Sequence, residues 1–184
     1  MKLCMIGTGY VGLVSGTCFA DIGNQVVCVD KDIAKIKKLN SGISPIYEPG
    51  LNELLKKNFS SKRLTFTTDI KAAIRSSDII FICVGTPTKG NSLKVDLSYV
   101  YKCTKQIYKY SNKKKIIVTK STVPVGTGDE IEKIIKKKKK LFSVISNPEF
   151  LREGEAIRDF RFPDRIVVGS NEKKVLNIMK KLYS

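Results

Sequence analysis

Three glycines near the start of the sequence have the spacing of a phosphate-binding turn. Gly7, Gly9 and Gly12 form the pattern G-x-G-x-x-G between a short apolar run at residues 3–6 and a helical pattern at residues 11–22. In such a turn the first glycine permits a tight bend, the second lets a phosphate approach the backbone, and the third lets the helix pack against the strand. The start of the helix, which includes Tyr10 and Val11, then presents free N–H groups and a partial positive charge to an anion.

An acidic residue, Asp30, closes the next apolar run, residues 26–29, at the position where a dinucleotide-binding unit needs one. Its carboxylate is placed to accept hydrogen bonds from the adenosine ribose hydroxyls and to repel a 2′-phosphate, although Lys31 is adjacent. The pattern therefore predicts NAD as the cofactor in preference to NADP. The alternative is a tight strand–helix turn followed by a surface aspartate. The candidate cofactor-binding residues in this segment are Gly7, Gly9, Tyr10, Val11, Gly12 and Asp30.

Short apolar runs alternate with helical patterns along the chain. The runs that we expect to form strands are residues 3–6, 26–29, 64–67, 79–84, 116–119, 142–145 and 166–168. Several are apolar at consecutive positions, as in strands that are covered on both faces. The expected helices are residues 11–22, 32–40, 51–58, 70–75, 97–110 and 128–138, the last ending in a solvated lysine stretch. This alternation predicts an α/β fold, a Rossmann-type doubly wound, mainly parallel sheet, in one domain over residues 1–184.

Distinctive short motifs follow several of the expected strands. Besides the glycine turn and Asp30, they are GTPT at residues 85–88, KSTVP at residues 120–124 and SNPEFLREG at residues 146–154. The carboxyl ends of parallel strands lie at one edge of a sheet, and ligands bind outside that edge. We therefore expect the functional site there.

The net charge of +17 suggests a nucleic-acid partner, but the kind of basic residue argues against one. Lysine outnumbers arginine 28 to 6, and the lysines are scattered over most of the expected helices. Arginine is the usual reader of bases, and the sequence contains no nucleic-acid-binding motif. The sequence also has no histidine, which excludes a Ser-His-Asp triad, a histidine general base and a histidine metal site.

The five cysteines have the positions of buried, reduced thiols. They stand at residues 4, 18, 28, 83 and 103 with no CxxC spacing, and four lie in expected strands or in the first helix. We therefore expect no disulfide or metal framework and a cytoplasmic location. No apolar run approaches the roughly 20 residues of a membrane span. The expected strand near the first residue leaves no room for a secretory signal.

Seven stretches of the chain, taken together and in their order along the sequence, resemble the UDP-glucose/GDP-mannose dehydrogenase family, and within it the UDP-glucose 6-dehydrogenases. They are IGTGYVGLVSGTCFADIGNQVVCVD at residues 6–30, KIKKLNSGISPIYEPGL at 35–51, VGTPT at 84–88, DLSYV at 96–100, KSTVPVGTGD at 120–129, NPEFLREG at 147–154 and PDRIVVG at 163–169. The resemblance implies oxidation of the C6 primary alcohol of a nucleotide sugar to a carboxylate, with two NAD and one water. UDP-glucose is the expected substrate, and GDP-mannose or UDP-N-acetylmannosamine is the alternative.

The resemblance also implies roles for residues in the strand-end motifs. Lys35 would help to hold the adenosine ribose, and Thr86 would hydrogen-bond the cofactor; their plainer alternatives are a solvated lysine and a loop cap. Thr122 and Glu149 would be catalytic around an ordered water, with the glutamate as acid or base. Thr122 and Glu153 would also lie at the cofactor, and we expect the two glutamates to share one face of a helical turn. The residues expected to contact the sugar nucleotide are Glu149, Phe150, Leu151, Arg152 and Glu153.

One element of the family pattern is missing from the matched region. In members of the family, the nucleophilic cysteine lies in a glycine-rich loop that follows the matched region in the sequence. The central helix and the UDP-binding domain also follow that region. None of the five cysteines replaces the nucleophile, because even Cys83, which lies nearest to a strand end, belongs to an apolar run. We therefore expect the NAD-binding, N-terminal portion of a longer enzyme, inactive alone and a homodimer or larger oligomer when complete. The alternative is a stand-alone NAD-binding regulatory module.

Overall fold

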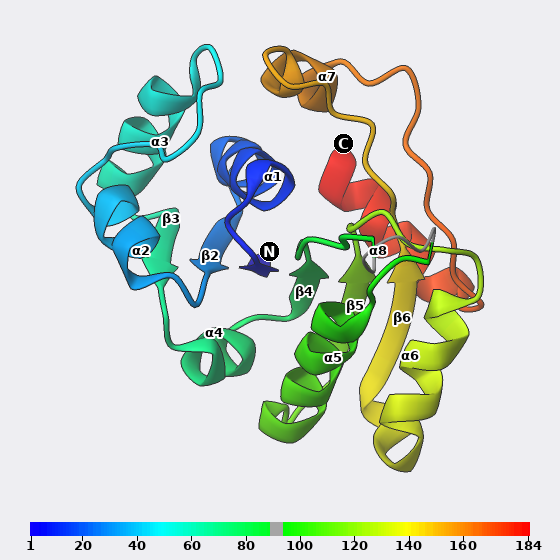
Figure 1. Cartoon of the computed structure of the whole chain (residues 1–184). Coiled ribbons are helices and arrows are strands. Elements are labelled where there is room, and N and C mark those ends of the chain that lie inside the picture. The colour runs from blue at the N-terminus through cyan, green and yellow to red at the C-terminus, as the bar shows by residue number, and fades with distance from the viewer. Residues whose placement is uncertain (89–93) are drawn as a thin grey trace.

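The computed structural model describes residues 1–88 and 94–184, which form a sheet between two layers of helices (Figure 1). Within these residues six strands, all paired in parallel, make up the sheet in the order β3-β2-β1-β4-β5-β6. The strands are β1 (Lys2–Ile6), β2 (Gln25–Val29), β3 (Leu64–Thr67), β4 (Ile79–Ile82), β5 (Lys115–Thr119) and β6 (Phe142–Ser146). The predicted doubly wound parallel sheet is therefore confirmed.

Helices cover both faces of this sheet (Figure 1). One face packs against α1 (Tyr10–Asp21), α2 (Ile33–Asn40), α3 (Leu51–Ser60), α7 (Ala156–Arg161) and α8 (Lys173–Tyr183). The other face packs against α4 (Ile70–Ser76), α5 (Ser98–Tyr110) and α6 (Thr127–Ile135), and a 3₁₀ helix, η1 (Lys136–Leu141), follows α6.

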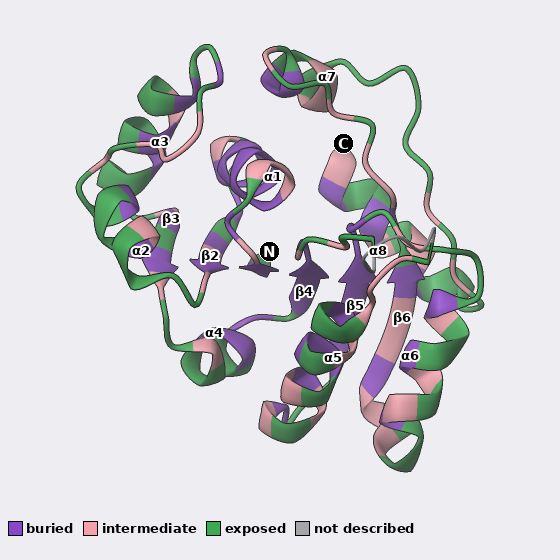
Figure 2. Cartoon of the chain, viewed as in Figure 1, coloured by how far each residue is buried: buried purple, intermediate pink, exposed green. Residues whose placement is uncertain are grey.

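The central strands are buried on both faces, as Figure 2 shows. In β1, Leu3 and Met5 belong to the core beneath α1, whereas Cys4 and Ile6 belong to the core beneath α5. Because successive side chains of a strand point to opposite faces, a strand between two helical layers can be apolar at every position. This explains the continuous apolar runs in the sequence.

The predicted strand at residues 166–168 is wrong. The backbone there forms no ladder, and only the next residue, Gly169, makes an isolated bridge to Ser146 at the end of β6. The carbonyl of Val167 instead accepts a hydrogen bond from the side chain of Asn147. Ile166 and Val167 are exposed, so their apolar character does not reflect a place in the sheet.

The predicted helix at residues 128–138 ends earlier than expected. Regular α-helix stops at Ile135, and the lysines that follow form η1, in which Lys138 has non-helical backbone angles. Like charges at helical spacing repel one another, and η1 buries none of its side chains to compensate. The helices α7 and α8 were not predicted, although Val175, Met179 and Leu182 give α8 a buried face with helical spacing.

One aromatic cluster joins four of these elements. Phe19 of α1 is fully buried, and its ring lies 5.2 Å from that of Phe81 in β4, 4.9 Å from that of Phe160 in α7 and 5.2 Å from that of Tyr183 in α8. Aromatic pairs at these separations stabilise a core beyond the area that they bury. Phe19 therefore attaches α7 and α8 to the first βα unit.

We predict that Phe19→Ala lowers the free energy of unfolding by about 3–5 kcal/mol, because it leaves a cavity where four elements meet. Urea denaturation followed by circular dichroism measures this change. Phe162→Ala is the matched control: this ring is 78% exposed, so the loss should stay within about 0.5 kcal/mol. Equal losses in the two variants would contradict the cluster's role.

Candidate functional site

The strand order reverses between β1 and β4, and the glycine turn lies at this point. β1 pairs with β2 on one side and with β4 on the other. In an open parallel sheet the crevice outside such a switch point is where ligands bind. The loops after β1, β4, β5 and β6 carry the glycine turn and the three motifs of the sequence, so the predicted site lies at one edge of the sheet.

The three glycines of the turn meet different surroundings. Gly7 has φ +104°, and a Cβ there would lie 2.6 Å from the carbonyl oxygen of Cys83. A Cβ on Gly12 would lie 2.0 Å from the carbonyl oxygen of Gly7, so α1 can lie this close to the end of β1 only because Gly12 lacks a side chain. A Cβ on Gly9 would meet nothing within 4 Å. Gly9 therefore lines open space in front of the start of α1, as a bound pyrophosphate requires.

Asp30 ties the end of β2 to this turn. Its Oδ2 accepts hydrogen bonds from the N–H of Thr8 at 2.9 Å and from the Thr8 hydroxyl at 2.8 Å, and its Oδ1 accepts one from the N–H of Asp32 at 3.1 Å. Burial opposes ionisation of this carboxyl, but these hydrogen bonds and the nearby Lys35 outweigh it and lower its pKa. The carboxylate is therefore charged at neutral pH, and Oδ1 retains acceptor capacity for a ribose hydroxyl.

The two lysines beside Asp30 point to different partners. Lys35 Nζ lies 3.5 Å from Asp30 Oδ2, next to the place expected for the adenosine ribose. Lys31 Nζ lies 5.2 Å from the centre of the Tyr99 ring, a cation–π separation.

The loops after β4 and β5 are joined by hydrogen bonds from side chains. The Thr86 hydroxyl donates to the carbonyl oxygen of Thr122 at 2.9 Å, and the Ser121 hydroxyl donates to the carbonyl oxygen of Val84 at 2.7 Å. The hydroxyl hydrogen of Thr86 is thus used within the protein, and toward a cofactor this oxygen can only accept. The structure brings Thr86 and Thr122 together at the carboxyl edge of the sheet.

The loop after β6 lines a cavity of about 620 Å³. The walls include Glu149, Phe150, Leu151 and Arg152, four of the five residues predicted to contact the sugar nucleotide, whereas Glu153 does not line it. In the sheet, Thr119 pairs with Ser146. Thr122 and Glu149 therefore each lie three residues beyond the same point of two neighbouring strands.

The expectation that Glu149 and Glu153 share a helical turn is wrong. Residues 147–152 are irregular, 153–155 form a turn, and α7 begins only at Ala156. Pro148 disfavours helical backbone at the residue before it, and Glu149 Oε2 accepts a local hydrogen bond from the N–H of Leu151 at 2.6 Å. The acidic residues therefore belong to a shaped loop.

A buried lysine that the sequence analysis did not single out lies at the base of this cavity. Lys120 is 4% exposed, and its Nζ donates to the hydroxyl of Tyr183 at 3.2 Å. That hydroxyl in turn donates to Asn147 Oδ1 at 2.6 Å. Burial lowers the pKa of Lys120, and the neighbouring Cys83 and Glu149 offset this only in part. Lys120 and Asn147 belong to the KSTVP and SNPEFLREG motifs, whereas Tyr183 lies in no distinctive sequence motif.

The five cysteines are buried, as predicted from the sequence, and each has a free thiol in the structure. Burial raises the pKa of Cys18 and Cys83 to about 12 and that of Cys103 to about 11, and it raises those of Cys4 and Cys28 as well. A thiol acts as a nucleophile in its ionised form, so none of them has the environment of an activated cysteine. Among the described residues no cluster of acidic and cysteine side chains could hold a metal ion, and no helix is long and apolar enough to cross a membrane.

Comparison with known proteins decides the family. The sequence pattern of the UDP-glucose/GDP-mannose dehydrogenase family, NAD binding domain, matches residues 1–184. The chain belongs to this family. It is 52% identical to the UDP-glucose 6-dehydrogenase of Rhizobium meliloti over the whole chain and 43% of that protein, and 54% identical to the UDP-glucose 6-dehydrogenase TuaD of Bacillus subtilis over 99% of the chain and 40% of that protein. The NAD-binding domain thus spans less than half the length of these relatives.

Solved structures of the family have the same fold as this NAD-binding domain. A GDP-mannose dehydrogenase from Pseudomonas aeruginosa superimposes with a TM-score of 0.94 and 38% identity, covering all of this chain and 44% of that one. A UDP-glucose dehydrogenase from Pyrobaculum islandicum superimposes with a TM-score of 0.92 and 37% identity, covering 98% of this chain and 43% of that one. The resemblance noted in the sequence is therefore confirmed, including NAD as the cofactor of this domain.

We predict that Gly9→Val keeps the fold and loses NAD, because its side chain enters the open space in front of α1. The φ of −70° at Gly9 suits any residue, so the melting temperature should change little. Calorimetric titration with NAD measures the binding. Gly12→Ala is the contrasting variant: its Cβ collides with backbone, so we expect destabilisation by about 1–3 kcal/mol or more. Normal NAD binding by a folded Gly9→Val protein would show that the phosphate site is elsewhere.

Proposed function

We propose that this chain is the cofactor-binding part of an NAD-dependent UDP-glucose 6-dehydrogenase. The observation that carries the proposal is the open space at Gly9, framed by the start of α1 and by the charged Asp30, at the switch point of the sheet. In the proposed reaction the C6 alcohol of UDP-glucose is oxidised to a carboxylate with one water, and NAD, when bound, accepts the hydride at each of two steps. Relatives named UDP-glucose 6-dehydrogenase, at 44–54% identity, support this substrate.

Cofactor binding in this proposal uses the residues around the turn. The first N–H groups of α1, at Tyr10 and Val11, would bind the pyrophosphate beside Gly9. Asp30 Oδ1 would accept a ribose hydroxyl, with Lys35 at its side. The oxygen of Thr86 would accept a hydrogen bond from the cofactor, since its own hydrogen is directed to the loop after β5.

The acid/base chemistry falls to Thr122 and Glu149 in this proposal. They lie at matched positions beyond β5 and β6, so an ordered water and the C6 group could be held between them. With no histidine in the chain, a carboxylate is the natural proton carrier. Glu153 would lie on the cofactor side of the loop, while residues 149–152 would contact the sugar nucleotide from the cavity wall.

Completion of the oxidation needs a nucleophile that the described residues do not offer, since their cysteines are all buried. We therefore propose that the chain works as part of a longer enzyme. We also propose that this enzyme is oligomeric and lies in the cytoplasm.

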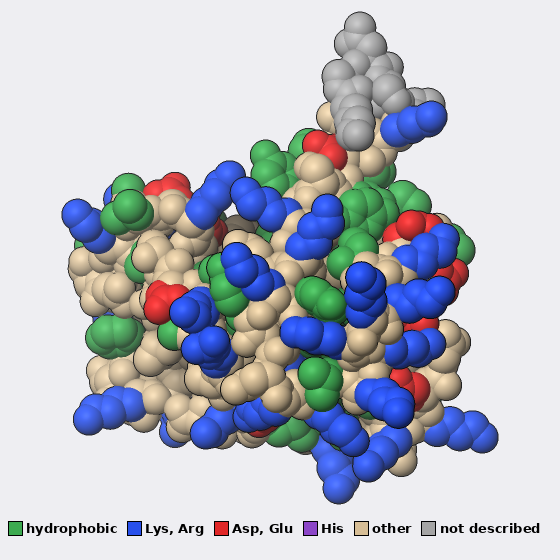
Figure 3. All heavy atoms as spheres, turned by 90° about the horizontal axis from the view of Figure 1, so that it is seen from below, with side chains coloured by type: hydrophobic (Ala, Val, Ile, Leu, Met, Phe, Trp, Pro, Cys, Tyr) green, Lys and Arg blue, Asp and Glu red, His purple; other side chains and the backbone are tan. Residues whose placement is uncertain are grey.

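A GDP-mannose-type substrate is the second candidate, because the structure of a GDP-mannose dehydrogenase matches this chain with a TM-score of 0.94. Nucleic acid is not a proposed partner: the lysine and arginine side chains are spread over the face in Figure 3.

We predict that the chain binds NAD much more tightly than NADP, because the ionised Asp30 repels a 2′-phosphate. Asp30→Ala should narrow this difference, whereas Asp32→Ala, which removes the cap of α2, should leave it unchanged. Because the pKa of Asp30 is lowered, the preference should persist between about pH 8 and pH 5. Titration calorimetry with both cofactors measures it, and equal affinities in the unmodified chain would refute the assignment.

We predict that the 184-residue chain alone produces no steady NADH from UDP-glucose and NAD, because the family's nucleophilic cysteine and its UDP-binding domain lie outside the matched region and the five cysteines present are buried. Absorbance at the NADH wavelength measures turnover, with NAD binding in the same sample as the control. Sustained turnover would contradict this account and would redirect attention to Cys83, which lies closest to the site.

In the longer enzyme, we predict that Glu149→Gln lowers turnover by roughly 10²-fold or more, since the amide cannot accept a proton. Thr122→Ala should cause a smaller loss, because a second water can replace the hydroxyl. NAD affinity and melting temperature should change little in either variant. If Glu149→Gln retained full turnover, or lost it only by unfolding, Glu149 would have a structural role.

A further inference from the structure

A buried carboxylate connects the glycine turn to the loop that carries Glu149. Glu48, in the segment between α2 and α3, is 6% exposed. Its Oε2 accepts hydrogen bonds from the hydroxyl of Tyr10 and from the N–H of Gly154 at 2.9 Å, and its Oε1 accepts one from the N–H of Ile157 at 3.2 Å. The N–H of Gly154 also lies 2.6 Å from the Tyr10 hydroxyl oxygen.

This arrangement supplies what the start of α7 lacks. The residue before the helix, Glu155, makes no side-chain cap, so its first N–H groups need acceptors from elsewhere. A buried carboxylate is costly unless hydrogen bonds compensate for its lost water, and charge-assisted bonds of this kind are the strong ones. Burial and the bond to Glu48 raise the pKa of Tyr10 to about 12, so its hydroxyl keeps its proton at neutral pH.

The two ends of this hydrogen-bonded cluster lie in the two halves of the proposed site. Tyr10 is the first residue of α1, next to Gly9 and the open space in front of the helix. Gly154 directly follows Glu153 and closes the loop whose residues 149–152 line the cavity. A movement of the first turn of α1 would therefore be passed to that loop through the side chains of Tyr10 and Glu48.

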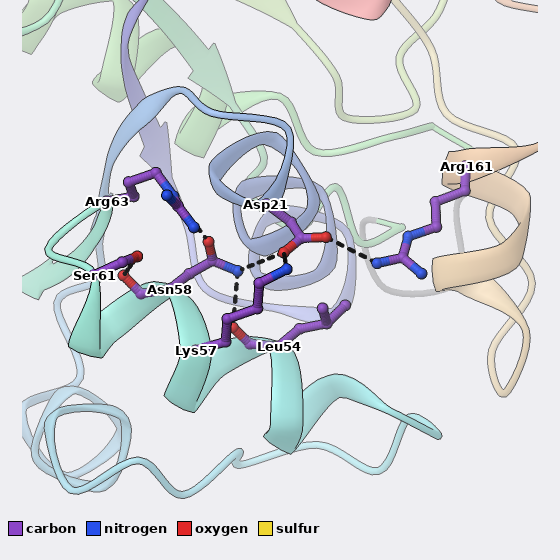
Figure 4. Close-up of polar contacts among 7 residues, drawn as sticks. All are labelled: Asp21, Leu54, Lys57, Asn58, Ser61, Arg63 and Arg161. Carbon is purple, nitrogen blue, oxygen red and sulfur yellow. Dashed lines mark hydrogen bonds and ion pairs between the residues drawn. The ribbon is translucent and has the colours of Figure 1, made fainter.

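The far end of α7 is held differently. Figure 4 shows Asp21, at the end of α1, with Lys57 and Asn58 of α3 on one carboxylate oxygen and Arg161 of α7 on the other. Burial opposes ionisation of Asp21, but these partners outweigh it and lower its pKa. Asp21 thus anchors α7 to α1 at the opposite end of α1 from the glycine turn, and it provides a matched control for Glu48.

We propose that Glu48 is a positioning residue that, together with Tyr10, couples cofactor binding at the glycine turn to the placement of the loop at residues 149–154. The proposal rests on the proposed function, since it requires NAD at the turn and the sugar nucleotide at the loop. When NAD orders the first turn of α1, Tyr10 and Glu48 hold the N–H groups of Gly154 and Ile157 more firmly. Because such coupling is reciprocal, ordering of the loop strengthens NAD binding by the same factor by which NAD binding favours the ordered loop.

Amide hydrogen exchange of the 184-residue chain with and without saturating NAD tests this coupling. In the unmodified chain NAD should slow exchange at Gly154 and Ile157 by about 5-fold or more, within the usual range of such coupling. Tyr10→Phe and Glu48→Gln should each reduce the NAD-dependent slowing to less than about 2-fold. Tyr10→Phe removes one hydroxyl from a partly buried ring, so it keeps the test valid if Glu48→Gln fails to fold.

Asp21→Asn is the control, because it loosens α7 without a link to the glycine turn. It should speed exchange in α7 with and without NAD and leave the NAD-dependent slowing intact. The coupling is overturned if calorimetry shows NAD binding but amide exchange at Gly154 and Ile157 is not slowed. It is also overturned if Asp21→Asn loses the NAD-dependent slowing, and in either case Glu48 is only a structural anchor. Absence of any NAD binding would instead overturn the proposed function, and the coupling with it.

Discussion

The site depends on the contact between the backbone of the glycine turn and the helix that follows it. A side-chain carbon on Gly12 would lie 2.0 Å from the carbonyl oxygen of Gly7, and one on Gly7 would lie 2.6 Å from that of Cys83. The absence of these side chains lets α1 pack directly against β1 and β2, with its first N–H groups aimed outside the switch point. Phe19, which belongs to the same helix, attaches α7 and α8 to it. A helix placed for phosphate binding therefore also organises one half of the core.

Buried and partly buried polar groups hold the loops of the site in place. Asp30 binds the glycine turn, Glu48 binds the start of α7, and Lys120 binds the hydroxyl of Tyr183 beneath the cavity. Glu48 and Lys120 are buried and Asp30 is partly buried, and a polar side chain in such a place is favourable only with well-placed partners. The carboxyl edge of the sheet is therefore held by polar contacts, whereas the sheet itself is held by apolar burial.

Elements governed by short-range rules could be predicted from the sequence, and those governed by tertiary contacts could not. The six paired strands follow from short apolar runs, several of them apolar at consecutive positions, and the glycine turn follows from its spacing in context. The run at residues 166–168 looked the same, but no neighbouring strand pairs with it beyond the bridge of Gly169 to Ser146. Glu48 and Tyr183 act through partners more than 30 residues away, and no local pattern signals such contacts. The catalytic assignments of Thr122 and Glu149 come from family resemblance and stay predictions.

An amide chemical-shift titration of the ¹⁵N-labelled, 20.6 kDa chain with NAD would show whether NAD binds where α1 meets the switch point. We expect the largest shifts on residues 7–13, on Asp30 and its neighbours, and on the loops after β4 and β5. Amides at the opposite edge of the sheet, around Lys114 and Lys140, should not move. Saturable shifts centred on that opposite edge, or no shifts at millimolar NAD, would contradict this placement of NAD.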